Sequence, residues 1–290
     1  MKKNSSTNKL NLSSNERLFI ESKSNFDPKK YDNILPSKFK IFTFKSGFKK
    51  IHDDLLIIIF NDVINSTNIY SKTSTPSAPI IWDKKNNKGK VKALIVNAGN
   101  ANAHTGKKGI KVINDYVKVL CSVIRCKKNE VLVSSTGVIG ELFNPRVITK
   151  QILKLDKKLP GDLLSAARSI MTTDTYPKTS VKNLNIGKKR IKIYGIAKGS
   201  GMIMPNMATM LVYIFIETKI DKLTIKKLLK NNLEDTFNSI SVDSDTSTSD
   251  TLFLFTTNDN EINFNNKKNF EKLNASIYNI MEDLSLKVIK

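Results

Sequence analysis

Apolar and polar positions along the chain follow two periods, one typical of strands and one typical of helices. Residues 91–96 (Val-Lys-Ala-Leu-Ile-Val) form a short apolar run with β-branched side chains, which predicts a strand. The next apolar positions recur every three or four residues, as on one face of a helix, at Ile110, Ile113, Val117, Leu120 and Ile124. The same patterns predict further strands at 39–44, 54–60, 130–133, 190–197, 210–216 and 251–255.

Helices are predicted near 145–155, 162–171 and 221–232, and at the C-terminal end. Residues 65–79 contain many Ser and Thr and two prolines, so we expect a loop there. Strands alternate irregularly with helices, which is typical of an α/β or α+β enzyme. Polar loops at strand ends are then the candidate site, at 97–106, 134–140, 172–178 and 198–209.

Composition favours a globular protein without a membrane span. The chain has 290 residues, 40% of them hydrophobic, and its longest uniformly aliphatic and Phe run, residues 55–60, is far too short to cross a bilayer. Residues 1–32 are rich in Lys, Asn and Ser and lack the apolar stretch of a secretory signal. We therefore expect a flexible basic extension at 1–32 and a cytoplasmic protein that does not bind membranes.

The net charge of +22 raises the question of nucleic-acid binding. Only five of the 48 basic residues are arginine, the side chain that forks onto guanine and phosphate. The lysines are scattered, and no aromatic residues interleave with them as a stacking platform requires. We therefore expect no nucleic-acid partner. A basic protein that binds nucleic acid is an alternative function.

Cysteine and histidine are too scarce to suggest a metal centre. Cys121 and Cys126 stand five residues apart, which is not the spacing of a CxxC redox or zinc site. The only histidines are His52 and His104. The sequence therefore predicts a reduced protein that holds no metal.

A glycine-rich run at 195–210 leads into the strand predicted from residue 210. Within it, the bond between Ala208 and Thr209 joins a small residue to a threonine that enters a buried strand. A chain that cut itself there would expose a threonine nucleophile. Its new α-amine, with a pKa of about 7.7–8.0, would accept the hydroxyl proton near neutral pH. The alternative is a plain glycine-rich turn before a core strand.

Two other loops offer groups for acyl chemistry. Residues 135–137 (Ser-Thr-Gly) end a predicted strand, where a hydroxyl and a backbone N–H would face a developing oxyanion; a simple turn is the alternative. Lys198 lies between glycines and would bind a carboxylate or polarise a carbonyl, unless it is merely solvated. The glycines match neither the Walker loop nor the dinucleotide fingerprint.

Six segments are informative when they are taken together, in chain order. They are 97–103 (Asn-Ala-Gly-Asn-Ala-Asn-Ala), 135–140 (Ser-Thr-Gly-Val-Ile-Gly), 171–178 (Met-Thr-Thr-Asp-Thr-Tyr-Pro-Lys), 195–203 (Gly-Ile-Ala-Lys-Gly-Ser-Gly-Met-Ile), 205–211 (Pro-Asn-Met-Ala-Thr-Met-Leu) and 243–250 (Asp-Ser-Asp-Thr-Ser-Thr-Ser-Asp). This set resembles the ornithine acetyltransferase (glutamate N-acetyltransferase) family, the bifunctional enzymes of arginine biosynthesis. The resemblance runs from about Leu35 to the end of the chain. It implies an αββα-like sandwich of the self-processing type, incomplete at the C-terminus.

The resemblance implies self-cleavage between Ala208 and Thr209, with an α-chain-like region at 33–208 and a partial β-chain-like region at 209–290. Thr209 is then the nucleophile, taking the acetyl group from N2-acetylornithine and passing it to glutamate by acyl transfer. This chemistry needs no metal or organic cofactor, and acetyl-CoA is an alternative donor. The fragments are expected to stay together as a heterotetramer.

By the same resemblance, Thr136 and Gly137 form the oxyanion hole. Lys198 and Thr209 match substrate-contacting positions, as does one threonine of the pair Thr172 and Thr173. These roles are carried over from the family motifs that match here.

The sequence departs from the family at three places. His104 replaces a cysteine; Ser244 and Ser249 replace a glycine and an asparagine; and no Asp-Gly-Glu-Gly segment is found before the sequence ends at Lys290. We expect either an incomplete chain or a degenerate paralogue. The alternatives to acetyl transfer are therefore an inactive or partner-dependent subunit and a threonine-nucleophile amidohydrolase or aminopeptidase that uses water.

Overall fold

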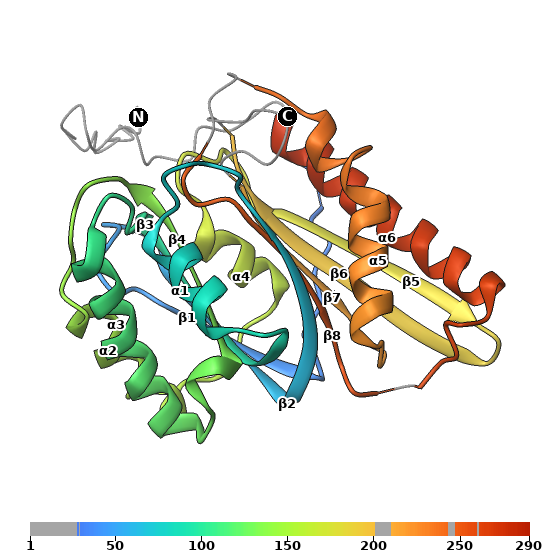
Figure 1. Ribbon diagram of the computed structural model, residues 1–290, viewed down its shortest axis with the longest axis horizontal. Coiled ribbons are helices and arrows are strands. Elements are labelled where there is room, and N and C mark those ends of the chain that lie inside the picture. Colours follow the sequence, from blue (N-terminus) through green and yellow to red (C-terminus); the bar gives the residue numbers. More distant parts are fainter. Residues whose placement is uncertain (1–27, 29, 201–209, 243–246, 260) are drawn as a thin grey trace, which may run out of the picture.

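The computed structural model describes residues 28, 30–200, 210–242, 247–259 and 261–290 (Figure 1). Its strands are β1 (Phe39–Phe44), β2 (Leu55–Tyr70), β3 (Lys90–Asn100), β4 (Val131–Val138), β5 (Lys178–Ile186), β6 (Lys189–Lys198), β7 (Leu211–Ile216) and β8 (Thr251–Thr256). Its α-helices are α1 (Ala78–Asn86), α2 (Gly106–Ile124), α3 (Arg146–Ile152), α4 (Leu163–Ile170), α5 (Lys222–Leu233) and α6 (Lys267–Ile289). Every strand and helix predicted from the sequence is present. The basic extension expected at 1–32 lies almost entirely outside the described residues.

The long strand β2 joins two sheets. Its first half pairs with β1 on one side and β3 on the other, and β4 continues this first sheet parallel to β3. Its last residues, from Ser66 to Tyr70, pair with β8 in a second sheet ordered β2-β8-β7-β6-β5. The loop predicted at 65–79 is therefore confirmed for 71–77 and wrong at both ends. Residues 65–70 belong to β2, where β8 supplies hydrogen-bond partners, and residues 78–79 begin α1.

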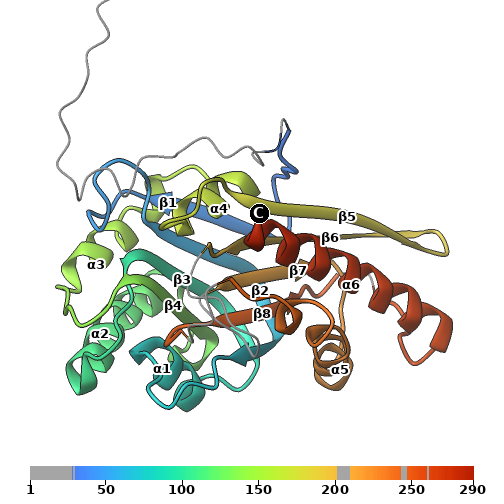
Figure 2. The same cartoon turned by 90° about the horizontal axis from the view of Figure 1, so that it is seen from above.

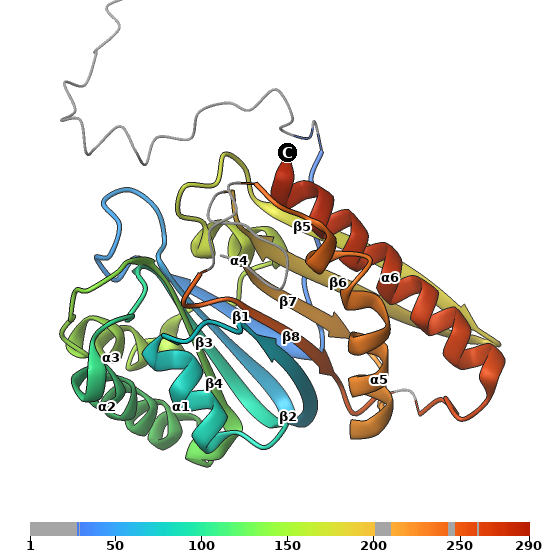
Figure 3. The same cartoon turned by 45° about the horizontal axis from the view of Figure 1, so that its top comes forward.

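Helices cover the outer face of each sheet. Helices α1, α2 and α3 pack on the first sheet, and α5 and α6 pack on the second (Figures 1 and 3). The inner faces of the two sheets meet in a third core, which α4 enters beside β1 and β5 (Figure 2). Phe39 of β1 and Phe215 of β7, with ring centroids 4.6 Å apart, join the sheets across this core. The expected αββα sandwich is confirmed.

This layering explains the uniformly apolar strands. In β7, Val212, Ile214 and Ile216 face the α5–α6 layer, whereas the alternate residues face the core between the sheets. A strand covered on both faces needs apolar side chains at every position. Strand β7 and its parallel neighbour β8 lie between β2 and β6, so residues before and after Thr209 share one sheet.

The helix starts carry side-chain caps where the sequence offers them. Asp162 accepts a hydrogen bond from the N–H of Ser165 at the start of α4, and Asp221 caps α5 through Leu223 and Thr224. Such caps satisfy N–H groups that have no partner within the helix. Among the described residues, no helix combines the length and the apolar character that crossing a bilayer requires.

Candidate active site

The ends of five strands meet at one edge of the sandwich. Strands β3 and β4 of the first sheet end there, and so does β6 of the second. Strand β7 is antiparallel to β6, and β8 is parallel to β7, so both begin at this edge. The described parts of the candidate site segments therefore come together, although they are far apart in the sequence.

Lys198 and Thr136 connect the two sheets directly. The ammonium group of Lys198, the last residue of β6, donates a hydrogen bond of 2.9 Å to Oγ1 of Thr136 in β4. Both residues are buried. Lys198 is thus not the solvated lysine of the alternative interpretation, and it lies beside one of the two predicted oxyanion-hole residues.

Asp174 holds this end of β6 in place. Its Oδ1 accepts hydrogen bonds from the Gly199 N–H (2.7 Å) and the Lys178 ammonium (2.7 Å). Its Oδ2 accepts the N–H of Thr172 over 3.0 Å. The carboxylate therefore ties the segment after α4 to the ends of β5 and β6, a role that sequence reasoning missed although Asp174 lies in one of the six matching segments.

The predicted substrate-contacting threonines lie next to this carboxylate. Thr172 is anchored through its backbone, and the hydroxyl of Thr173 is 2.9 Å from the hydroxyl of Ser200. Thr173 is exposed, whereas Thr172 is half-buried. Substrate contact by either remains a prediction.

Burial and charge shape the titration of the pair Asp174 and Lys198. Burial alone opposes ionisation of Asp174, but the charges of Lys178 and Lys198 and the N–H of Gly199 hold its pKa at about 2. Burial lowers the pKa of Lys198, with a smaller contribution from Lys178, against the attraction of Asp174 and Asp250. A buried ammonium with a lowered pKa is a common feature of functional sites.

Lys49 adds a third amine close to Thr136, Asp174, Lys178 and Lys198, which together form the Lys198 cluster. Its ammonium donates to the carbonyls of Met171 (3.1 Å) and Ser169 (3.3 Å), at the end of α4. Burial lowers its pKa to about 8, although Asp54 and Asp174 favour the charged form. No pattern in the sequence separates Lys49 from the many surface lysines, so it was missed.

Asp250 fixes the start of β7. Its Oδ1 accepts the N–H of Met210 over 2.8 Å, and the carbonyl of Met210 accepts the N–H of Thr251 over 3.0 Å. Burial raises the pKa of Asp250 to about 7, although hydrogen bonds from Met210 and Ser247 and the charge of Lys198 favour the carboxylate. The carboxyl group thus holds the residue that precedes β7, and the backbone of that residue pairs with the first residue of β8.

Three residues singled out in the sequence lie outside the described part of the chain. They are Ala208 and Thr209, the predicted cleavage site and nucleophile, and Ser244, which stands where the family has a glycine. Met210, which follows Thr209 directly, is described and buried. Self-cleavage at this bond therefore stays a prediction.

At Gly137 the backbones of β3 and β4 are too close to leave room for a side chain. Its φ is +128°, and a Cβ added to it would lie 2.3 Å from the carbonyl carbon of Gly99. Gly99, its register partner in β3, has a φ of +121°. Any side chain at Gly137 would force β3 and β4 apart, which is a specific reason for glycine here. Its oxyanion role remains a prediction.

The side chains next to Thr136 are also fixed. Ser135 donates to Oδ1 of Asn97 over 2.6 Å, and Nδ2 of Asn97 donates to the carbonyl of Asn100 over 2.7 Å. These bonds set the ends of β3 and β4 relative to each other. Among the described residues, no group of three or more His, Cys, Asp and Glu side chains is placed to hold a metal ion.

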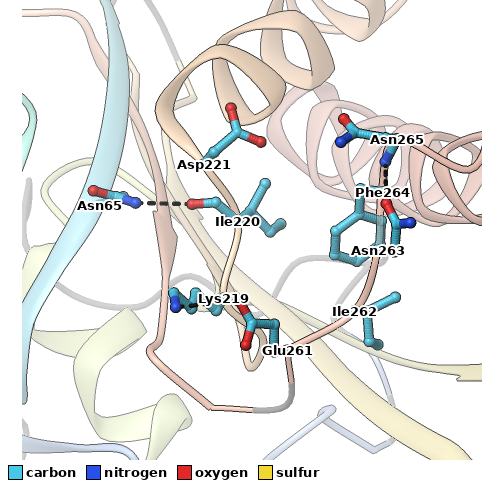
Figure 4. Close-up of a pocket in the computed structure, with 9 residues that line it drawn as sticks. All are labelled: Asn65, Lys219, Ile220, Asp221, Glu261, Ile262, Asn263, Phe264 and Asn265. Atoms are coloured by element: carbon cyan, nitrogen blue, oxygen red, sulfur yellow. Dashed lines mark hydrogen bonds and ion pairs between the residues drawn. The ribbon is translucent and has the colours of Figure 1, made fainter.

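A cavity of about 660 Å³ lies at the opposite ends of β7 and β8 (Figure 4). Its wall includes Lys219 and Glu261, paired at 3.3 Å, and the Asn65 side chain, which donates to the Ile220 carbonyl over 2.8 Å. The Lys198 cluster lies where these two strands begin, so the cavity is remote from it. The cavity wall contains none of the predicted site residues.

The sequence of the chain matches a known protein family. The model of the ArgJ family matches residues 40–290. The arginine biosynthesis bifunctional protein ArgJ of Bradyrhizobium diazoefficiens is 40% identical over 221 residues, which cover 75% of this chain and 54% of that protein. The crystal structure of the arginine biosynthesis bifunctional protein ArgJ from Bacillus halodurans has a TM-score of 0.55 and 33% identity, and the match covers 59% of this chain and 92% of that one.

A more distant likeness concerns the fold alone. The L-aminopeptidase D-Ala-esterase/amidase from Ochrobactrum anthropi, described as a variant of the Ntn-hydrolase fold, has a TM-score of 0.50 at 10% identity. That match covers 86% of this chain and 82% of the other. This chain spans 54% of the length of the Bradyrhizobium diazoefficiens protein and 66% of the length of the ArgJ protein of Agrobacterium fabrum.

Proposed function

Because the chain belongs to the ArgJ family, we propose that it transfers the acetyl group of N2-acetylornithine to glutamate, with Thr209 as the nucleophile. The observation that supports this most is the 2.9 Å hydrogen bond between Lys198 and Thr136. Lys198 also pairs in register with Leu211, two residues after Thr209. Thr136 and the lysine bonded to it therefore lie close to the start of β7, which supports Thr209 as the proposed nucleophile.

Before any transfer, water hydrolyses the bond between Ala208 and Thr209 once, which leaves a carboxylate on Ala208 and a free α-amine on Thr209. The free α-amine of Thr209 then accepts the hydroxyl proton as the oxygen attacks the acetyl carbonyl. The C–N bond of acetylornithine breaks, its amine takes the proton, and ornithine leaves an acetyl ester on Thr209. The amine of glutamate attacks this ester, releasing the threonine hydroxyl and forming N-acetylglutamate.

Thr136 is proposed to stabilise the oxyanion that forms in both attacks. An ammonium group has only donors, so the Thr136 oxygen accepts from Lys198 and keeps its own hydrogen for another partner. That hydrogen and the N–H of Gly137 are the two proposed donors. Preorganised donors of this kind are worth about 3–4 kcal/mol each in well-studied acyl transfer enzymes.

The charge of the cluster suits an anionic substrate. Lys49, Lys178 and Lys198 bring three amines to a region that also holds the carboxyl groups of Asp54, Asp174 and Asp250, and Asp250 has a pKa near neutrality. Charged amines in a poorly solvated region attract a carboxylate. Both proposed substrates, acetylornithine and glutamate, carry an α-carboxylate, and Lys198 with Thr172 or Thr173 is the proposed contact.

The remaining parts of the proposal concern assembly and location. We infer that the fragments before and after Thr209 remain associated, since β7 and β8 are central strands of the second sheet. We propose that the fragments assemble as a heterotetramer and that the protein is cytoplasmic. The reaction needs no cofactor, and acetyl-CoA is an alternative acetyl donor. Water as acceptor, giving a hydrolase, is the competing function that the fold permits.

Intact mass spectrometry of the purified chain tests the proposal, with Thr209→Ala as the matched control. Wild-type protein should separate into two fragments at Ala208–Thr209, and the variant should stay whole. Added acetylornithine should leave one acetyl group on the fragment that starts at Thr209, and glutamate should remove it. Acetate release without glutamate would instead indicate a hydrolase, and an uncleaved wild-type chain would overturn self-processing.

A further inference from the structure

The two cysteines of the chain meet at the end of α2. The helix ends at Ile124, and Arg125 adopts a left-handed conformation with a φ of +54°. This residue turns the backbone so that the N–H of Cys126 donates to the carbonyl of Cys121 over 3.2 Å. The bond closes the helix in the manner of a Schellman motif, in which the side chains at these two positions come into contact.

The contact in this case is between two thiols. Sγ of Cys126 donates a hydrogen bond to Sγ of Cys121 over 3.6 Å. Both cysteines pack against the core of the first sheet but are only half-buried, so each residue keeps part of its surface in contact with solvent. The five-residue separation that argues against a CxxC motif in the sequence is therefore compatible with a dithiol in the fold.

We propose that Cys121 and Cys126 form a thiol–disulfide exchange site that reacts with small disulfides, such as oxidised glutathione, and closes to an intrachain disulfide. The two sulfurs need to approach from 3.6 Å to about 2.05 Å, the length of an S–S bond. The proposal is independent of acetyl transfer, because neither cysteine belongs to the Lys198 cluster.

The exchange proceeds in two balanced steps. The thiolate of Cys121 attacks one sulfur of oxidised glutathione, forming a mixed disulfide and releasing one glutathione thiolate. Cys126 then gives its proton to solvent and attacks Sγ of Cys121, which releases the second glutathione. The two protein thiols are oxidised, and one small disulfide is reduced to two thiols.

The surroundings set the order of the steps. The hydrogen bond from Cys126 lowers the pKa of Cys121, and Lys128 adds to this effect, whereas burial and Glu130 oppose it. The same hydrogen bond raises the pKa of Cys126, which holds the shared proton. Once Cys121 is a mixed disulfide its negative charge is gone, so Cys126 ionises more readily and attacks in turn.

The test uses the reduced full chain and oxidised glutathione, with acid quenching and intact mass spectrometry. Because Cys121 and Cys126 are the only cysteines, each product has a unique mass. Wild-type protein should lose two hydrogens and retain no glutathione. Cys126→Ser should retain one glutathione stably, and Cys121→Ser should react at least tenfold more slowly than Cys126→Ser.

Comparison with the unfolded chain separates a site built by the fold from two cysteines that are merely near in sequence. In mixtures of reduced and oxidised glutathione, the equilibrium constant for closure should be at least tenfold higher for folded protein than for protein in urea. A wild-type chain that collects glutathione on both cysteines, forms only intermolecular dimers, or shows no preference over the unfolded chain would overturn the proposal.

Discussion

Lys198 donates a hydrogen bond of 2.9 Å to the hydroxyl oxygen of Thr136, and the two residues belong to different sheets of the sandwich. The bond fixes the direction of the Thr136 hydroxyl, since an oxygen that accepts from an ammonium group turns its own hydrogen elsewhere. A lysine and a threonine that are 62 positions apart thus act as one unit. Substitutions in this unit, or in the carboxylates and glycines around it, should therefore change either acyl transfer or stability.

Replacing Thr136 by valine should slow formation of the acetyl adduct on Thr209. Valine keeps the shape of threonine but removes the O–H donor, and loss of one oxyanion donor reduces kcat about 10²–10³-fold. Thr136→Ser keeps the donor and should lose far less. Single-turnover mass spectrometry with acetylornithine measures both variants, and equal rates for valine and serine would contradict the donor role.

Asp174→Asn should reduce the free energy of unfolding at pH 7 by about 3–5 kcal/mol, because it leaves the buried ammonium of Lys178 without its counter-charge. The pKa of Asp174 is about 2 when folded and 3.8 as its ordinary value, so its contribution is present above about pH 4 and is lost as the pH falls through 2. Urea unfolding at pH 7 and pH 3 measures this difference.

Asp259→Asn is the matched control for Asp174→Asn. Asp259 also pairs with a lysine, Lys38 at 2.9 Å, but both side chains are more than one third exposed. Exposed pairs contribute about 0.2–1 kcal/mol, so the control should unfold nearly as wild type does. Equal losses in the two variants would show that burial does not strengthen the Asp174 pair.

Asp250→Asn should flatten the dependence of stability on pH between about 4 and 7. The pKa of Asp250 rises from 3.8 to about 7 on folding, so the folded state binds the extra proton and wild-type stability falls as the pH rises through this range. Across the whole range, ionisation of Asp250 should lower the free energy of unfolding of the wild type by roughly 4 kcal/mol at most. Asparagine keeps an oxygen for the Met210 N–H and does not titrate.

The measurement for Asp250 is a pair of urea unfolding series, wild type and Asp250→Asn, at about pH 5, 6, 7 and 8, which span the titration range. The difference in the free energy of unfolding should move in favour of the variant as the pH increases. Parallel curves would show that Asp250 is ionised throughout this range and would contradict its raised pKa.

Gly137→Ala should destabilise the protein far more than Gly140→Ala. Both glycines have positive φ values, +128° and +88°, but only Gly137 lies against another backbone, that of Gly99. Alanine at position 140 incurs the left-handed strain alone, about 1–2 kcal/mol. Alanine at position 137 must also push β4 from β3, which adds about 1–3 kcal/mol. Thermal and urea unfolding compare the two.

Much of the fold was predictable because burial repeats a local pattern. The runs at 211–216 and 251–255 are apolar at almost every position, which is typical of strands covered on both faces, and the structure has β7 and β8 there. The apolar face predicted for the helix at 110–124 packs against the first sheet. In each of these segments the side chains alone indicate how they will be buried.

The secondary-structure predictions are wrong where a segment forms a strand because a partner strand pairs with it. Residues 66–70 are largely polar, yet they extend β2 because β8 lies alongside. Strand β5 was not predicted at all, since its alternating polar residues resemble a loop until β6 pairs with it along its whole length. Local propensity cannot anticipate a partner strand that only the folded chain brings alongside.

The sequence by itself determined the family, the sandwich class and the candidate residues Thr136, Gly137, Lys198 and Thr209, because these rest on motifs and on short apolar runs. Only the tertiary structure decided which groups act on one another. It placed Asp174 and Asp250 against the buried lysines, and it folded Cys126 back onto Cys121. Hydrogen bonds, charges and burial act over a few ångströms in space, and the separation of two residues in the sequence does not show whether they are that close.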